Sequence, residues 1–135
     1  MAATYRLPSA WKVIWITGAS SGIGREVALR LAASGAKVAV SARSADKLAE
    51  LEAASLNIKA YPLDVADLAA TQATAAAIAS ELGPIDLAIL NAGVWVPMDA
   101  ESYDATGITK AMAVNYSGVT NALGPLIPAD RKSVV

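Results

Sequence analysis

Short apolar runs alternate with longer segments of helical periodicity along the whole chain. The apolar runs predict four strands, at residues 12–17, 37–41, 58–63 and 85–90. The longer segments predict four helices, at residues 23–34, about 44–55, 66–82 and about 103–123. Because parallel strands joined by helices form a doubly wound sheet, this order predicts an α/β fold in a single domain over residues 1–135.

Individual residues mark the expected ends of these elements. Gly35 and the Gly83-Pro84 pair are typical of helix C-termini, and Ser44 is a candidate N-cap. Pro62 lies inside the third strand and lacks an amide hydrogen, which favours an edge position for that strand. The tail from Lys132 to Val135 is interpreted as the beginning of a fifth strand.

Composition and charge narrow the classes of function. Hydrophobic residues make up 55% of the chain and charged residues 17%, which indicates elements buried on both faces or a surface that needs a partner. A net charge of -1 gives no basic field for nucleic acid. Histidine and cysteine are both absent, so we predict no disulfide, no thiol chemistry and no metal site.

The N-terminal segment has no long apolar run behind a basic start, which is unlike a signal peptide. No stretch of the sequence approaches the roughly 18 unbroken apolar residues of a membrane span. We therefore expect no membrane partner and a cytoplasmic location.

The turn after the first strand, Thr17-Gly18-Ala19-Ser20-Ser21-Gly22-Ile23-Gly24, has the composition of a phosphate-binding loop. Gly18 permits the sharp turn, Gly22 lets the backbone approach a pyrophosphate, and Gly24 lets the helix pack close to the sheet. The helix that follows directs its free N–H groups at the phosphates. A glycine-rich turn without a ligand is the alternative, and the position between a strand and a helix favours the cofactor.

The glycine spacing, Gly-x-x-x-Gly-x-Gly, is one residue wider than the dinucleotide fingerprint of the larger dehydrogenases. Together with Asp64-Val65, Asn91-Ala92-Gly93 and Asn115, it resembles the short-chain dehydrogenase/reductase family. The motifs follow one another in the family's order over residues from about 11 to 135. The resemblance implies a Rossmann-type fold with strand order 3-2-1-4, ending after the fourth β-α unit with a stub of the fifth strand.

The resemblance also implies a set of residues that bind a nicotinamide dinucleotide. Along the pyrophosphate and ribose these are Gly18, Ser20, Ser21, Gly22, Ile23 and Gly24. Asp64 accepts a hydrogen bond from the adenine amino group, and Val65 lies against the ring. Asn91, Ala92 and Gly93 run beside the adenosine ribose.

Three of the singled-out residues have an alternative role. The resemblance makes Asn115 a residue that interrupts its helix and holds a water in a proton relay, whereas a satisfied helix asparagine is the alternative. Asp64 is also a candidate cap for the helix that begins near Ala66. Trp95 either borders the active-site cleft or packs in the fold.

The end of the second strand bears on the choice of cofactor. An NAD-preferring site places an acidic residue there to hold the ribose 2′-hydroxyl. This chain has Ser41-Ala42-Arg43, and the Arg43 guanidinium is suited to a 2′-phosphate. We therefore expect NADP(H) to be preferred, with NAD(H) possible, and a solvated surface arginine is the alternative.

The catalytic residues of the family are missing from this sequence. The family uses a serine and a Tyr-x-x-x-Lys pair on one helix face. The four tyrosines, Tyr5, Tyr61, Tyr103 and Tyr116, are followed four residues later by Ser9, Val65, Gly107 and Thr120. We therefore expect the NADP(H)-binding part of an oxidoreductase that is inactive alone. A non-catalytic NADP(H)-binding or sensing module and a functionless remnant are the alternatives.

The fourth strand predicts self-association. Residues 85–90 are apolar and contain neither proline nor lysine, the residues that usually protect the edge of a sheet. Only the stub Ser133-Val134-Val135 is available to cover this strand. We therefore expect a homo-oligomer that forms through the fourth strand or through the helix around Asn115.

Overall fold

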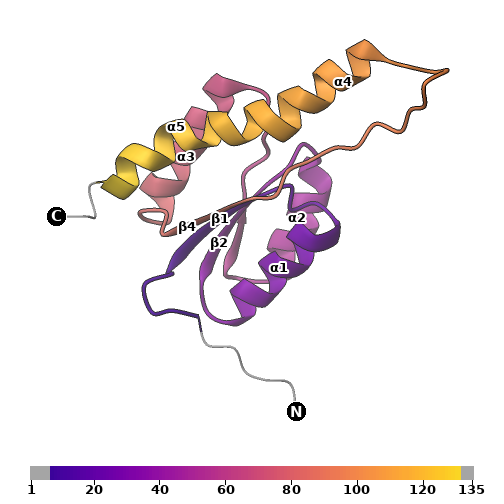
Figure 1. Ribbon diagram of the computed structural model, residues 1–135. Coiled ribbons are helices and arrows are strands. Elements are labelled where there is room, and N and C mark those ends of the chain that lie inside the picture. The colour runs from indigo at the N-terminus through magenta and orange to yellow at the C-terminus, as the bar shows by residue number, and fades with distance from the viewer. Residues whose placement is uncertain (1–6, 132–135) are drawn as a thin grey trace.

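The computed structural model describes residues 7–131 as helices arranged around one parallel sheet (Figure 1). The strands are β1 (Val13–Thr17), β2 (Lys37–Ser41), β3 (Ile58–Ala60) and β4 (Leu87–Leu90). The helices are α1 (Gly22–Ala33), α2 (Ala45–Ala53), α3 (Leu68–Glu81), α4 (Ala105–Met112) and α5 (Gly118–Arg131), with a π-helical segment, η1 (Ala113–Ser117), between the last two. The predicted doubly wound α/β fold is confirmed.

The sheet has the order β3-β2-β1-β4, as the family resemblance implied. All three neighbouring pairs are parallel, and Thr17 at the end of β1 is in register with Ser41 on one side and Leu90 on the other. The carboxyl ends of these strands therefore lie along one edge of the sheet. The edge position that Pro62 predicted for β3 is also confirmed.

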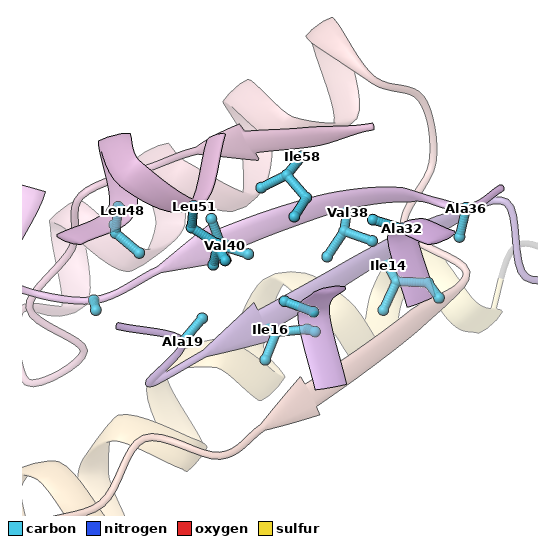
Figure 2. Packing of buried hydrophobic residues seen from close by; sticks show 12 residues of the cluster. Ile14, Ile16, Ala19, Ala32, Ala36, Val38, Val40, Leu48, Leu51 and Ile58 are labelled. Carbon is cyan, nitrogen blue, oxygen red and sulfur yellow. The ribbon is translucent and has the colours of Figure 1, made fainter. Parts of the chain in front are cut away.

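Alternate residues of the strands contribute their side chains to two apolar layers, one on each face of the sheet. On one face, Ile14 and Ile16 of β1 pack with Val38 and Val40 of β2 beneath α1 and α2 (Figure 2). These four side chains have no exposed surface, and Leu48 and Leu51 of α2 complete the layer. The continuous apolar runs of the sequence follow from this burial on both faces.

The opposite face of the sheet carries α3 and α5. Val13 and Trp15 of β1 lie here with Tyr61, Leu63 and Val65 from the segment after β3. Trp15 is fully buried, and its indole Nε1 donates a 3.0 Å hydrogen bond to the Ser41 hydroxyl on β2. Because a buried indole N–H needs an acceptor, the Ser41 hydroxyl allows Trp15 to lie in the core without an unpaired donor.

Three strands are shorter than the sequence suggested, β1 by one residue, since it begins at Val13, and β3 and β4 by more. β3 ends at Ala60, although the Tyr61 and Leu63 amides still donate to the β2 segment, to the Val40 and Ala42 carbonyls, at 2.8 and 2.9 Å. Pro62 lies between them at a position that points away from β2, so its missing amide hydrogen does not interrupt these alternate bonds. β4 begins at Leu87, two residues after the expected start at Ile85.

The last helix differs most from its prediction. Its expected end near Leu123 is wrong, because α5 continues to Arg131 with Pro125 and Pro128 inside it. A proline removes one helical hydrogen bond but leaves the rest of the turn. α5 lies along α3 (Figure 1), and fully buried Ala122 belongs to the apolar layer on this face. The predicted fifth strand lies outside the described residues.

Two predicted helix ends agree with the structure. α1 ends at Ala33 with Gly35 beyond it, and α3 ends at Glu81 with Gly83 beyond it. Ser44 occupies the N-cap of α2, but its side chain makes no capping hydrogen bond. Within residues 7–131, none of the helices has the length and apolar character to cross a membrane.

Candidate nucleotide-binding site

A groove of about 870 Å³ lies where the loops after the four strands meet, at the carboxyl edge of the sheet. Each loop contributes to its wall. The lining residues are Gly18, Ser20, Ser21, Gly22 and Ile23 after β1, Ala42, Arg43, Ser44 and Lys47 after β2, Leu63, Asp64 and Val65 after β3, and Asn91, Ala92, Gly93 and Val94 after β4, with Val114 from η1. Ligands of open α/β sheets bind in this position.

The structure brings together the cofactor-binding residues expected from the sequence. All of them line the groove except Gly24, which is buried beside it. Sequence reasoning missed the apolar lining by Leu63, which the two-residue alternation with Val65 would have indicated. It also missed Lys47, which lies one helical turn after the N-cap of α2.

The turn after β1 has the backbone that its glycines predicted. Gly18 and Gly22 have φ angles of 68° and 57°, in the left-handed region that other residues rarely adopt. Ser21 is the N-cap of α1, and its side chain makes no capping hydrogen bond. Ser21, Gly22 and Ile23 line the groove, so the N-terminus of α1 lies at its wall, where free helix N–H groups favour an anion.

Close contacts hold this turn against the loop after β4. A side-chain carbon at Gly24 would lie 2.5 Å from the Gly18 carbonyl oxygen and 2.6 Å from the Asn91 Nδ2 atom. Asn91 Nδ2 itself donates a 3.1 Å hydrogen bond to that carbonyl. The Ala92 amide donates to the Thr17 hydroxyl at 3.1 Å, so two hydrogen bonds join the turn to the second loop.

The wall that follows β2 is basic. Arg43 and Lys47 are both exposed, and both line the groove. None of the lining residues described after β2 is acidic, whereas an NAD-preferring site has a carboxylate in this region. The N-cap position of Ser44 adds the N-terminus of α2 to the same wall.

Asp64 and Val65 form the wall after β3. Asp64 is exposed, and its Oδ1 atom accepts a 3.0 Å hydrogen bond from the Ala66 amide. The alternative in which Asp64 caps the next helix is wrong, because Asp67 is the N-cap of α3 and accepts from the Ala70 amide at 2.9 Å. Asp64 is thus not needed to cap α3.

Asn115 does not line the groove but is bonded to a residue that does. Its Oδ1 accepts from the Val94 amide and its Nδ2 donates to the Val94 carbonyl, both at 2.7 Å. Both ends of the side-chain amide are therefore satisfied, as in the alternative interpretation. Asn115 lies in η1, where the helix is interrupted. Trp95, in the same loop as Val94, is 84% exposed, so a packing role within the described fold is wrong.

A comparison with protein families decides which class of protein carries this groove. The family model described as short chain dehydrogenase matches residues 12–133. The chain belongs to this family. The assignment confirms the resemblance that the glycine turn and the three motifs after it indicated.

Several curated dehydrogenases and reductases are similar to this chain. It is 35% identical over 128 residues to a 3-dehydrosphinganine reductase of Arabidopsis thaliana, an alignment that covers 91% of this chain and 38% of the reductase. It is 38% identical over 120 residues to the 2,3-dihydro-2,3-dihydroxybenzoate dehydrogenase of Bacillus subtilis, covering 82% of this chain and 44% of that enzyme. The chain thus spans less than half the length of these relatives.

Solved structures show the same relation. A short-chain dehydrogenase from Streptomyces avermitilis matches with a TM-score of 0.85 at 30% identity, over 90% of this chain and 45% of that one. An alcohol dehydrogenase from Thermococcus sibiricus, complexed with 5-hydroxy-NADP, matches with a TM-score of 0.84 at 27% identity, over 90% of this chain and 54% of that one. Both matches therefore cover most of this chain and about half of each solved structure.

Proposed function

We propose that this chain is the NADP(H)-binding part of an oxidoreductase that transfers hydride between a nicotinamide cofactor and an alcohol or carbonyl compound. The observation that carries the proposal is the groove, because the residues expected after each of the four strands converge on it. The relatives named above, a reductase and two dehydrogenases, support the reaction class.

The residues of the groove fit a dinucleotide. The N-terminus of α1 and the Ser21 hydroxyl would hold the pyrophosphate, and the absence of side-chain atoms at Gly22 leaves its surroundings open. Asp64 would accept from the adenine amino group, with Val65 beside the ring. Ile23 would lie along the pyrophosphate and ribose, and Asn91 to Gly93 would lie beside the adenosine ribose. When bound, the nicotinamide would supply the hydride chemistry.

The basic wall after β2 supports a preference for NADP(H). Arg43 and Lys47 bring two positive charges to the groove, and the Ser44 hydroxyl has no capping bond to satisfy it. A ribose 2′-phosphate would take charge-assisted hydrogen bonds from these groups. The structural neighbour complexed with 5-hydroxy-NADP is consistent with this preference.

Calorimetric titration with NADP, NAD and 2′,5′-ADP tests the cofactor. A charged hydrogen bond contributes about 1.5–3 kcal/mol, so we expect NADP to bind roughly 10- to 150-fold more tightly than NAD. Arg43→Ala lowers that ratio and Ala42→Asp inverts it, whereas Lys110→Ala, an exposed lysine on α4, leaves it unchanged. Equal affinity for NAD and NADP in the unchanged chain would refute the preference.

We also propose that the 135-residue chain binds its cofactor without turning over a substrate by itself. No tyrosine of the sequence has a lysine four residues later, so the acid/base pair of the family is missing. A module that binds or senses NADP(H) without catalysis is the second candidate, and the intact groove is equally compatible with it.

Self-association is the remaining part of the proposal. β4 has no partner on its outer side among residues 7–131, and its four residues are all half-buried. An exposed apolar row also follows the last helices, at Ile108, Met112, Tyr116, Leu123 and Ile127. Surfaces of this kind favour a second copy that pairs at β4 or packs along the helix around Asn115.

A further inference from the structure

Two residues of helix α5 contact Val65 in the loop after β3. The Asn121 side chain, on the sheet-facing side of α5, donates a 2.9 Å hydrogen bond from Nδ2 to the Val65 carbonyl. The bond is half-buried and joins residues that are 56 positions apart in the sequence. It therefore fixes the backbone of the loop from outside the loop itself.

Gly118, one turn earlier in α5, faces the same residue. A side-chain carbon at Gly118 would lie 2.6 Å from Val65 Cγ2 and 3.1 Å from Val65 Cβ. These distances are shorter than carbon atoms tolerate, so only glycine allows the helix to approach this closely. Val65 is 6% exposed and β-branched, which leaves it little freedom to turn away.

The neighbouring Asp64 has no comparable support of its own. Its side chain is exposed, and its hydrogen bond to the Ala66 amide is local to the loop. The place of the carboxylate in the groove therefore depends on where Val65 is held. The contacts with α5 supply that support.

We propose that Asn121 and Gly118 are positioning residues for base recognition, which hold Val65 so that Asp64 meets the amino group of adenine. The inference rests on the proposed function, since it requires the groove to bind a dinucleotide. Neither residue lines the groove. Their effect on binding is therefore transmitted through Val65.

The test compares NADP with nicotinamide hypoxanthine dinucleotide phosphate, which lacks the amino group that Asp64 would bind. A hydrogen bond to a carboxylate gives a preference for NADP of roughly tenfold or more in the unchanged chain. We expect Asn121→Ala to reduce this preference to about threefold or less. Calorimetry of both dinucleotides measures the ratio directly.

Asn57→Ala is the matched control. Asn57 Nδ2 also donates a half-buried hydrogen bond to a backbone carbonyl, that of Ala32, at 3.0 Å, but neither residue lines the groove. Loss of either bond should lower the unfolding temperature to a similar extent. Only the Asn121 variant should lose the discrimination between the two bases, which a merely structural role would leave unchanged.

Gly118→Ala and Gly124→Ala form a second pair on α5, which keeps the test decisive where Asn121→Ala fails to fold. The added carbon at Gly118 meets Val65, whereas nothing lies within 4 Å of one added at Gly124. Gly124 precedes Pro125, so its alanine also strains the helix. We expect base discrimination to fall in Gly118→Ala and to persist in Gly124→Ala.

The outcomes separate this inference from the proposed function. An unchanged chain that binds no NADP overturns both. An unchanged chain that binds NADP without preferring adenine to hypoxanthine overturns the inference alone. The inference alone is also overturned if the unchanged chain prefers adenine and both the Asn121 and the Gly118 variants retain the full preference.

Discussion

Alanine at Gly24 would place a methyl group in the tightest contact of the glycine turn. Its carbon would lie 2.5 Å from the Gly18 carbonyl oxygen and 2.6 Å from Asn91 Nδ2, whereas non-bonded heavy atoms rest about 3.5 Å apart. Either α1 moves outward or the Asn91 side chain leaves the carbonyl. Both movements widen the junction between the turn and the loop after β4.

The cost is the sum of three effects. Overpacking of a tight contact costs about 1–3 kcal/mol. Weakening the 3.1 Å hydrogen bond from Asn91 to Gly18 costs about 0.5–1.5 kcal/mol. Since Gly24 lies within α1, the better helix propensity of alanine offsets about 1 kcal/mol of this loss. We expect Gly24→Ala to lower the free energy of unfolding by roughly 1–3 kcal/mol.

Urea denaturation followed by far-ultraviolet circular dichroism measures this loss. With a typical slope of about 1–3 kcal/mol per molar urea, the midpoint should fall by roughly 1 M. A double-mutant cycle with Asn91→Ala should show a coupling of at least about 0.5 kcal/mol, because Asn91 supplies one of the two clashing atoms. Gly22→Ala strains a left-handed residue with no neighbour within 4 Å, so it should not couple to Asn91. A wild-type midpoint for Gly24→Ala, or additive effects of Gly24→Ala and Asn91→Ala, would refute this reasoning.

Three further predictions address activity, assembly and pH. The 135-residue chain should oxidise no NADPH with a panel of ketones, and turnover that co-purifies with it but disappears in Asn115→Ala would contradict this. Light scattering after size exclusion should show concentration-dependent association, and a monomer at every concentration tested would contradict the proposed association through β4 or the helix around Asn115. Hydrogen bonds from Lys59 and Tyr61 lower the pKa of Glu81, so its stabilising effect should hold above pH ~4.5 and be lost as the pH falls through the lowered pKa. Glu81→Gln should therefore flatten the acid side of the melting-temperature profile, and an unaltered profile would count against this role.

Local patterns predicted most of the sheet and its cofactor-facing loops. β2 matches its expected residues 37–41, because a short apolar run between a glycine and a helix start leaves little choice of register. The glycine turn was also predictable from a local pattern, because Gly18 and Gly22 stand where the turn requires positive φ angles. The order of strands needed the family resemblance, because periodicity does not specify which strands are neighbours.

Features that depend on distant contacts could not be predicted in this way. The hydrogen bonds between Asn115 and Val94 join a helix to a loop 21 residues earlier, and no local signal marks them. The continuation of α5 through Pro125 contradicts helix propensity, and packing along α3 outweighs it. Asp67 was not recognised as the cap of α3, because Asp64 lies close by with the same side chain.

The two edge strands of the sheet, β3 and β4, differ in how readily they can pair with a further strand. The amides of β3 that point away from β2 are those of Ile58 and Ala60, and they donate to the Ser55 carbonyl and to Glu52 Oε1. The next outward position is Pro62, which has no amide hydrogen. An incoming strand therefore finds no free amide donor at these positions, which disfavours head-to-tail stacking of β4 onto β3. Association through β4, as proposed above, would then favour closed pairs over growing fibrils.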